Sequence, residues 1–185
     1  MKSLISSGFS AVCVLSLTLF SMSARAKSPM WVTPAISYGH VHPLPHAAVQ
    51  PSKAKIYKAL FDVTSKIKNS SHPDAGLVHV ARAVNVFASA GVPLNHLRFV
   101  AMVHGPATAA VLNNGAYKRK YGHDNPNLKL IAQLRKAGVQ VDVCGQALAD
   151  LHFKHAWVQK GVRIDLSALA TVVIYGDWGY AYMKQ

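Results

Sequence analysis

The chain has 185 residues, of which 51% are hydrophobic and 15% are charged, so it is too apolar to be disordered and too varied for a coiled coil or a collagen. Its length suits one ordinary domain with a sizeable core. Lysine and arginine number 20 against 7 acidic residues, all of them aspartate, which excludes HExxH zinc peptidases and mechanisms that depend on glutamate.

Residues 1–26 have the pattern of a secretory signal peptide. Lys2 precedes an apolar run over residues 9–20, and Ala24 and Ala26 supply the small residues that a signal peptidase requires. The run is shorter than the roughly 20 residues that cross a bilayer, so we expect cleavage and a periplasmic or secreted protein with no stable membrane anchor. A retained anchor is the alternative. Export argues against nucleic acid as the partner of this basic chain.

Cleavage after Ala26 would remove Cys13 and leave Cys144 as the single thiol. No intramolecular disulfide could then form, although the compartment is oxidising. Cys144 is therefore a buried apolar residue, a crosslink to another chain or a reactive group.

Residues 27–52 are rich in proline and lack periodicity, which predicts an extended arm outside the domain. The spacing of His40, His42 and His46 could offer imidazoles to a metal ion, but no cysteine or carboxylate lies nearby. Exposed loop histidines are the plainer interpretation, and we expect no resident metal. We also expect no cofactor, because the chain has no GxGxxG or P-loop pattern.

The domain itself is expected over residues 53–185. Residues 58–64 predict a first strand with Asp62 near its carboxyl end. An amphipathic helix should begin at Pro73-Asp74 and end at Gly91. A second strand follows over residues 97–103.

The second strand should stop at His104-Gly105-Pro106 and give way to a short helix over residues 107–112. The basic cluster Lys118-Arg119-Lys120 fits a solvated turn better than a binding patch. Asn125 then predicts a helix cap, with Pro126 in the first turn and Gly138 beyond the end.

Residues 139–143 predict a third strand that ends directly at Cys144, and residues 147–153 predict another helix. Residues 166–175 favour a strand by local propensity, although the pattern leaves them undecided. Residues 176–182 offer a turn and a closing strand. Alternating strands and helices predict an α/β fold with a mainly parallel sheet and helices on both faces.

His104 and Cys144 both fall between a predicted parallel strand and the helix after it, where open α/β sheets bind ligands. Backbone N–H groups at a helix start favour a thiolate at Cys144, and His104 could act as acid, base or orienting group. An inert buried cysteine and a structural histidine are the alternatives. The adjoining binding candidates are Gly105, Gly145, Gln146 and, more weakly, Asp62, and we expect Gly145 to leave room for a bulky sulfur adduct.

Four stretches together resemble the DsrE/DsrF-like family over most of residues 55–182. They are VHGPA at residues 103–107, NPNLKLIAQLRKAGVQVDVCGQAL at residues 125–148, SALATVV from Ser167 and GYAY from Gly179. The resemblance implies a three-layer α/β/α fold of about five mainly parallel strands in a flavodoxin-like arrangement, with residues 166–175 largely helical. It also implies assembly as homotrimers or homohexamers.

Members of that family that act in sulfur relay carry sulfur as a persulfide on a cysteine after a central strand, and Cys144 matches that residue. We therefore expect an exported sulfur carrier, rather than a classical turnover enzyme, that exchanges sulfur with donor and acceptor proteins or small sulfur anions. The signal peptide and the histidine-bearing arm depart from the family pattern. The alternative is a non-catalytic oligomeric binding protein for a small anion or a metal ion.

Overall fold

The computed structural model describes residues 30–185, so the predicted signal peptide lies outside the described residues. Five parallel strands form one sheet in the order β4-β3-β2-β1-β5. The strands are β1 Tyr57–Val63, β2 Leu97–Val103, β3 Gln140–Cys144, β4 Arg163–Asp165 and β5 Ala181–Lys184. The α-helices are α1 Ala75–Ser89, α2 Asn114–Tyr121, α3 Leu128–Lys136, α4 Gly145–Asp150 and α5 Ala168–Asp177.

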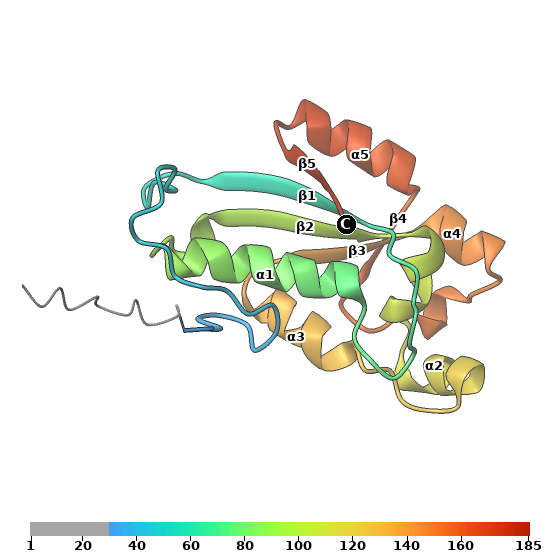
Figure 1. Cartoon of the computed structure of the whole chain (residues 1–185). Helices are drawn as coiled ribbons and strands as arrows, with labels where there is room; N and C mark the ends of the chain where they lie inside the picture. The colour runs from blue at the N-terminus through green and yellow to red at the C-terminus, as the bar shows by residue number, and fades with distance from the viewer. Residues whose placement is uncertain (1–29) are drawn as a thin grey trace, which may run out of the picture.

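Helices α1 and α3 cover one face of the sheet and α5 covers the other, which confirms the predicted three-layer α/β/α fold (Figure 1). The chain moves in one direction from β1 to β4 and then crosses back along α5, so that β5 pairs with β1. The strand order therefore reverses beside β1. None of the described helices is long and apolar enough to cross a membrane.

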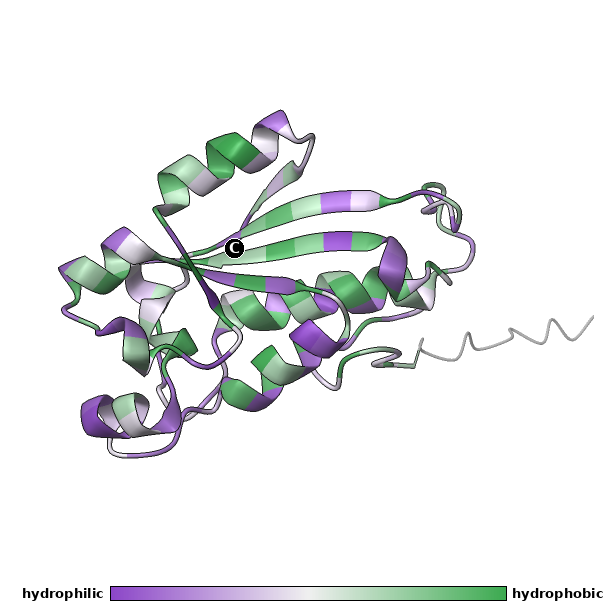
Figure 2. Ribbon diagram, turned by 180° about the vertical axis from the view of Figure 1, so that it is seen from behind, coloured by the Kyte–Doolittle hydropathy of each residue, from purple (hydrophilic) through white to green (hydrophobic). Residues whose placement is uncertain are grey.

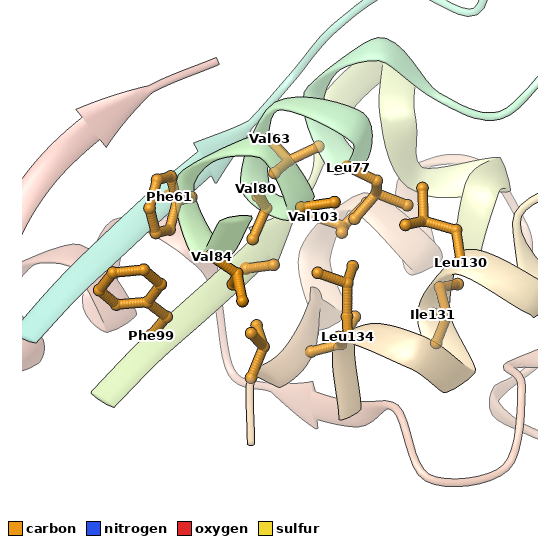
Figure 3. Close-up of a cluster of buried hydrophobic side chains, with 14 of the residues drawn as sticks. Phe61, Val63, Leu77, Val80, Val84, Phe99, Val103, Leu130, Ile131 and Leu134 are labelled. Atoms are coloured by element: carbon orange, nitrogen blue, oxygen red, sulfur yellow. The ribbon is translucent and has the colours of Figure 1, made fainter. Parts of the chain in front are cut away.

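The main core lies between the sheet and the α1/α3 layer (Figure 3). The predicted apolar face of α1 is confirmed, because Leu77, Val80, Ala81 and Val84 are all fully buried. Leu130 and Leu134 of α3 are buried against the same layer. This face therefore carries most of the hydrophobic stabilisation, and the α5 face has a much smaller apolar cluster.

The propensity of residues 166–175 for a strand gives the wrong structure, and the family resemblance gives the right one. Ser167 caps α5 by accepting a hydrogen bond from the amide of Ala170, and Ala168, Thr171 and Tyr175 form the buried stripe. These three positions recur at helical spacing. Packing on the sheet thus outweighs the β-branched composition of the segment.

Two elements were missed and one helix is tighter than expected. Helix α2 includes the basic cluster Lys118-Arg119-Lys120, which is exposed to solvent as expected but lies in the last turn of a helix rather than in a loop turn. Cations there are favourable because they face the negative end of the helix dipole. Strand β4 has three residues, too short to leave a sequence signal, and residues 105–111 form a 3₁₀-helix in place of the short α-helix.

The predicted cap of α3 is wrong by two residues. The helix begins at Leu128, with Asn127 in the N-cap position. Asn125 is instead buried, and its side-chain amide donates to the carbonyl oxygens of Ala110 and Leu112. The residue therefore ties the loop before α3 to the chain that follows β2.

The predicted arm is folded onto the domain, since residues 30–52 lie against α1 and α3 (Figure 1). Val32 and Val41 pair as an antiparallel bridge, and Ile36 between them is fully buried. Buried Asn85 of α1 holds the loop, because its side chain accepts from the amides of Ala35 and Ile36 and donates to three backbone carbonyls of the same loop. The segment is thus part of the folded surface.

We expect Asn85→Ala to lower the free energy of unfolding by about 2–3 kcal/mol, because it leaves buried backbone groups of the loop without partners. Urea denaturation would measure the loss. The matched control is Gln133→Ala, which removes the exposed hydrogen bonds from α3 to Ser37 and should cost clearly less. Equal losses for the two variants would contradict the role assigned to Asn85.

Candidate functional site

The carboxyl edge of the sheet gathers three of the predicted residues. Asp62 lies near the end of β1, His104 directly follows β2, and Cys144 is the last residue of β3. Side chains alternate across a strand, so Asp62 shares the α5 face with Leu60, which belongs to the same small apolar cluster as Cys144. The edge also contains the strand-order reversal, the place where open α/β sheets bind ligands.

The sulfur of Cys144 lies between the starts of two helices. Cys144 is the N-cap residue of α4, and its Sγ accepts from the amide of Ala147 at 3.4 Å. The same Sγ accepts from the amide of Ala168, the first residue of α5, at 3.3 Å. The side chain is 5% exposed. Two N–H groups from different elements thus converge on one sulfur atom, which favours a negative charge there.

The neighbours of Cys144 hold α4 close to β4. A Cβ atom at Gly145 would lie 2.8 Å from the carbonyl oxygen of Asp165, so glycine is required by the close approach of the two backbones. The expected room for a sulfur adduct is therefore not at Gly145. Gln146 is exposed, and its side-chain amide donates to the carbonyl oxygen of Leu166.

His104 and Asp62 are brought together by the pairing of β1 with β2. Nε2 of His104 bonds Oδ1 of Asp62, and Oδ2 of Asp62 accepts from the hydroxyl of Tyr182 in β5. The hydrogen bond to Asp62 raises the pKa of Tyr182 above its usual value. Tyr182 was missed, because only the return of β5 to the side of β1 places it there.

No hydrogen bond joins His104 to Cys144 within residues 30–185. The carboxylate of Asp62 fixes the ring of His104, which stays about one quarter exposed, on the strand next to Cys144. The edge thus has two polar centres side by side, one built on a sulfur atom and one on an imidazole. The ring of His104 is held by the carboxylate of Asp62, and the sulfur of Cys144 accepts hydrogen bonds from two backbone amides.

Below Cys144, the ion pair of Asp142 with Arg163, whose side chain is 55% exposed, joins β3 to β4, and Gln140 links the pair to α5. Asp142 is fully buried, and its Oδ1 lies 3.1 Å from Nε of Arg163. Gln140 donates to Oδ2 of Asp142 and to the hydroxyl of Tyr175 on α5, each at 2.6 Å. Burial raises the pKa of Asp142 to about 6, and the bonds from Gln140 and the charge of Arg163 oppose that rise.

The three arm histidines are not brought together as a metal site. The ring of His42 packs against Trp31 with centroids 3.6 Å apart and planes tilted by 38°, and His40 and His46 are exposed. Residues 30–185 contain no group of three histidine, cysteine or acidic side chains that could hold a metal ion. The described chain therefore gives no support to the metal-binding alternative.

The fold and the edge define a class: a single α/β domain whose parallel sheet has a buried cysteine at the end of an inner strand. The model of the DsrE/DsrF-like family matches residues 58–184, which is most of the chain. The chain belongs to the DsrE/DsrF-like family. A comparison with curated proteins found no match.

Two solved structures share the fold. One is a protein of unknown function, MTH1491 from Methanobacterium thermoautotrophicum, with a TM-score of 0.51 and 16% sequence identity over 70% of this chain and 99% of that one. The other is the ychN protein from E. coli, with a TM-score of 0.51 and 15% identity over 70% of this chain and all of that one. Both matches support the architecture alone.

The raised pKa of Asp142 predicts how stability depends on pH. Between about pH 4, where a carboxyl titrates in an unfolded chain, and about pH 6, the folded protein keeps a proton that the unfolded chain has released. The stability that this proton contributes is present below pH 4 and is lost as pH rises through 6. We expect the melting temperature of the wild type, minus that of Asp142→Asn, to be larger at pH 4.5 than at pH 7.5.

Thermal melts of both proteins across this range would measure the difference. The matched control is Asp177→Asn, since Asp177 is an exposed aspartate at the end of α5. Its difference from the wild type should stay flat over the same range. A flat difference for Asp142→Asn as well would contradict the assignment.

Proposed function

We propose that the protein is an exported sulfur carrier in which the thiolate of Cys144 accepts, holds and passes on sulfane sulfur as a persulfide. The observation that supports it most directly is the pair of amides, from Ala147 and Ala168, that donate to Sγ. Membership of the DsrE/DsrF-like family and the strand-end position of the cysteine add to it. The signal-peptide pattern of residues 1–26 supports export.

Loading is a displacement at sulfur. The thiolate of Cys144 attacks a sulfane sulfur of a polysulfide dianion, a bond forms between the two sulfur atoms, and the adjoining S–S bond breaks. The electron pair leaves on the shortened polysulfide dianion, so no external oxidant or reductant is needed. The new bond moves the reactive sulfur about 2 Å further from the backbone, which matters because Sγ itself is largely buried.

His104 is the acid, base or orienting group for that exchange. Its bond to Asp62 fixes the ring at the carboxyl edge, one strand from Cys144. A fixed imidazole beside the sulfur can protonate a departing thiolate or hold an incoming sulfur anion. The excess of lysine and arginine attracts anionic donors to the protein.

The carrier proposal predicts that the purified protein gains one sulfur atom on Cys144 when it is incubated with inorganic polysulfide. The gain should be reversed by a thiol reductant, and the Cys144→Ser variant should show none. Intact-mass measurement followed by peptide mapping would test this. An unmodified Cys144 that also resists alkylation would contradict the proposal and would favour a binding protein for small anions.

The partners that we propose are sulfur donors and acceptors together with further copies of this chain, as a homotrimer or homohexamer. The supporting feature is α5, which is largely hydrophobic along its length (Figure 2) and carries exposed apolar residues. Leu169 is 84% exposed and Val173 is 64% exposed, and Leu166, Ile174 and Trp178 extend the same surface. An exposed apolar patch of this kind is typical of an interaction site.

We expect the Leu169→Glu and Val173→Glu double variant to shift the protein toward the monomer, because each charge would be buried without a partner in an assembled interface. Light scattering after size-exclusion chromatography would give the masses. The matched control is Val86→Glu, since Val86 is an exposed apolar residue on α1, on the opposite side of the sheet. Equal masses for the wild type and the double variant would exclude α5 as the contact.

A further inference from the structure

A cavity of about 410 Å³ opens at the carboxyl edge of the sheet, beside the start of α4. Its walls come from the 3₁₀-helix after β2, from the end of α2 and from α4. Ala147 belongs to the wall, and its amide is one of the two that donate to Sγ of Cys144. Gly105, which follows His104, belongs to it too. Cys144 and His104 are not themselves in the lining, so the cavity approaches the two polar centres through Ala147 and Gly105. Its volume lies in the range of small-molecule sites, roughly 300–1,000 Å³.

The cavity carries one charge of each sign. Lys120 lines it from α2, and Asp150 lines it from the end of α4. The Nζ atom of Lys120 lies 5.6 Å from the ring centroids of both Tyr121 and Phe153, which also line the cavity. The two rings hold the ammonium group in place. Among the ion pairs of residues 30–185, none joins Lys120 to Asp150, so both charges are free for a ligand.

The rest of the lining is apolar, with Pro106, Ala109 and Leu151 beside the two rings. An apolar wall favours an organic ligand over a bare inorganic anion, and the carboxylate of Asp150 would repel such an anion. Gly105 faces open space and has a backbone φ of +53°, a left-handed conformation that suits glycine. The wall next to His104 therefore leaves room for a ligand.

We propose that this cavity binds a small zwitterionic thiol of the amino-acid type and its hydropersulfide, with the carboxylate at Lys120 and the ammonium at Asp150. The assignment rests on the carrier role proposed above and names its donor. The Cys144 thiolate attacks the outer sulfur of R–S–SH, the S–S bond of the donor breaks, and its electron pair leaves on R–S⁻. The product is Cys144–S–SH, and charge, atoms and oxidation levels balance.

The test is a titration of the ¹⁵N-labelled protein with S-methyl-L-cysteine, which carries both charges and has no free thiol to react. The amides of Gly105 and Ala147 should shift in a saturable manner. Lys120→Gln should weaken binding by about 3- to 5-fold, the range of a partly exposed ion pair. The matched control Lys118→Gln removes a charge from the same helix outside the cavity and should leave the affinity unchanged.

Two derivatives of the probe assign the charges. The methyl ester has no carboxylate, so its affinity should not respond to Lys120→Gln. The N-acetyl derivative has no ammonium group, so its affinity should not respond to Asp150→Asn, a variant that should weaken the parent probe. Absent shifts at Gly105 and Ala147, or equal affinities for Lys120→Gln and Lys118→Gln, would overturn the assignment.

Loading of the wild-type protein by inorganic polysulfide separates this inference from the carrier role. Sulfur uptake on Cys144 without binding of the probe would overturn the cavity assignment alone. Binding of the probe without sulfur uptake from either polysulfide or L-cysteine hydropersulfide would overturn the transfer step. Faster uptake from the hydropersulfide by the wild type than by Lys120→Gln would support both steps.

Discussion

The return of the chain from β4 to β5 is the constraint on which the rest of this structure depends. Those two strands lie at opposite edges of the five-stranded sheet, four strand spacings or about 19 Å apart. Because all five strands are parallel, α5 must also carry the chain back along the strands: Ala168 at its start bonds Cys144 at the end of β3, and Tyr175 bonds Gln140 at the beginning of that strand. The crossing covers the second face, brings the amide of Ala168 to Cys144 and places Tyr182 beside Asp62.

The face of the sheet that α5 covers carries polar contacts as well as a small apolar cluster. The ion pair of Asp142 and Arg163 joins β3 to β4, and Asp165 accepts a hydrogen bond from Thr171 in the early part of α5. These bonds hold the start of α5 over the end of β3. The sulfur of Cys144 is therefore positioned by a polar network that includes Asp142 in β3 and Asp165 in β4.

At the carboxyl edge, Cys144 and His104 are held by groups of different kinds. Backbone amides stabilise a negative charge on sulfur without adding a side-chain cation, while Asp62 fixes His104 on the next strand. The cavity beside them adds an ammonium group held over two rings and a separate carboxylate. These charges and the apolar walls suit the organic zwitterion that we propose better than a bare sulfur anion.

The sequence by itself determined the strands that supply the site and the long buried helix, because strong periodicity and end signals are local. Asp62, His104 and Cys144 could thus be placed at one edge from the alternation of strands and helices alone. The sequence also indicated the family, and with it the largely helical state of residues 166–175, which propensity contradicts and which the structure shows as α5.

Only the tertiary structure decided the contacts that give those residues their chemistry. The amide of Ala168 reaches the edge through the crossing of α5, Tyr182 through the pairing of β5, and Lys120 through the docking of α2. None of these long-range contacts leaves a local sequence pattern. In the sequence, Gly145 predicts open space beside Cys144, but in the structure the backbone at the end of β4 occupies that space. Local sequence sets which residues end a strand, and packing between distant segments sets what each of them touches.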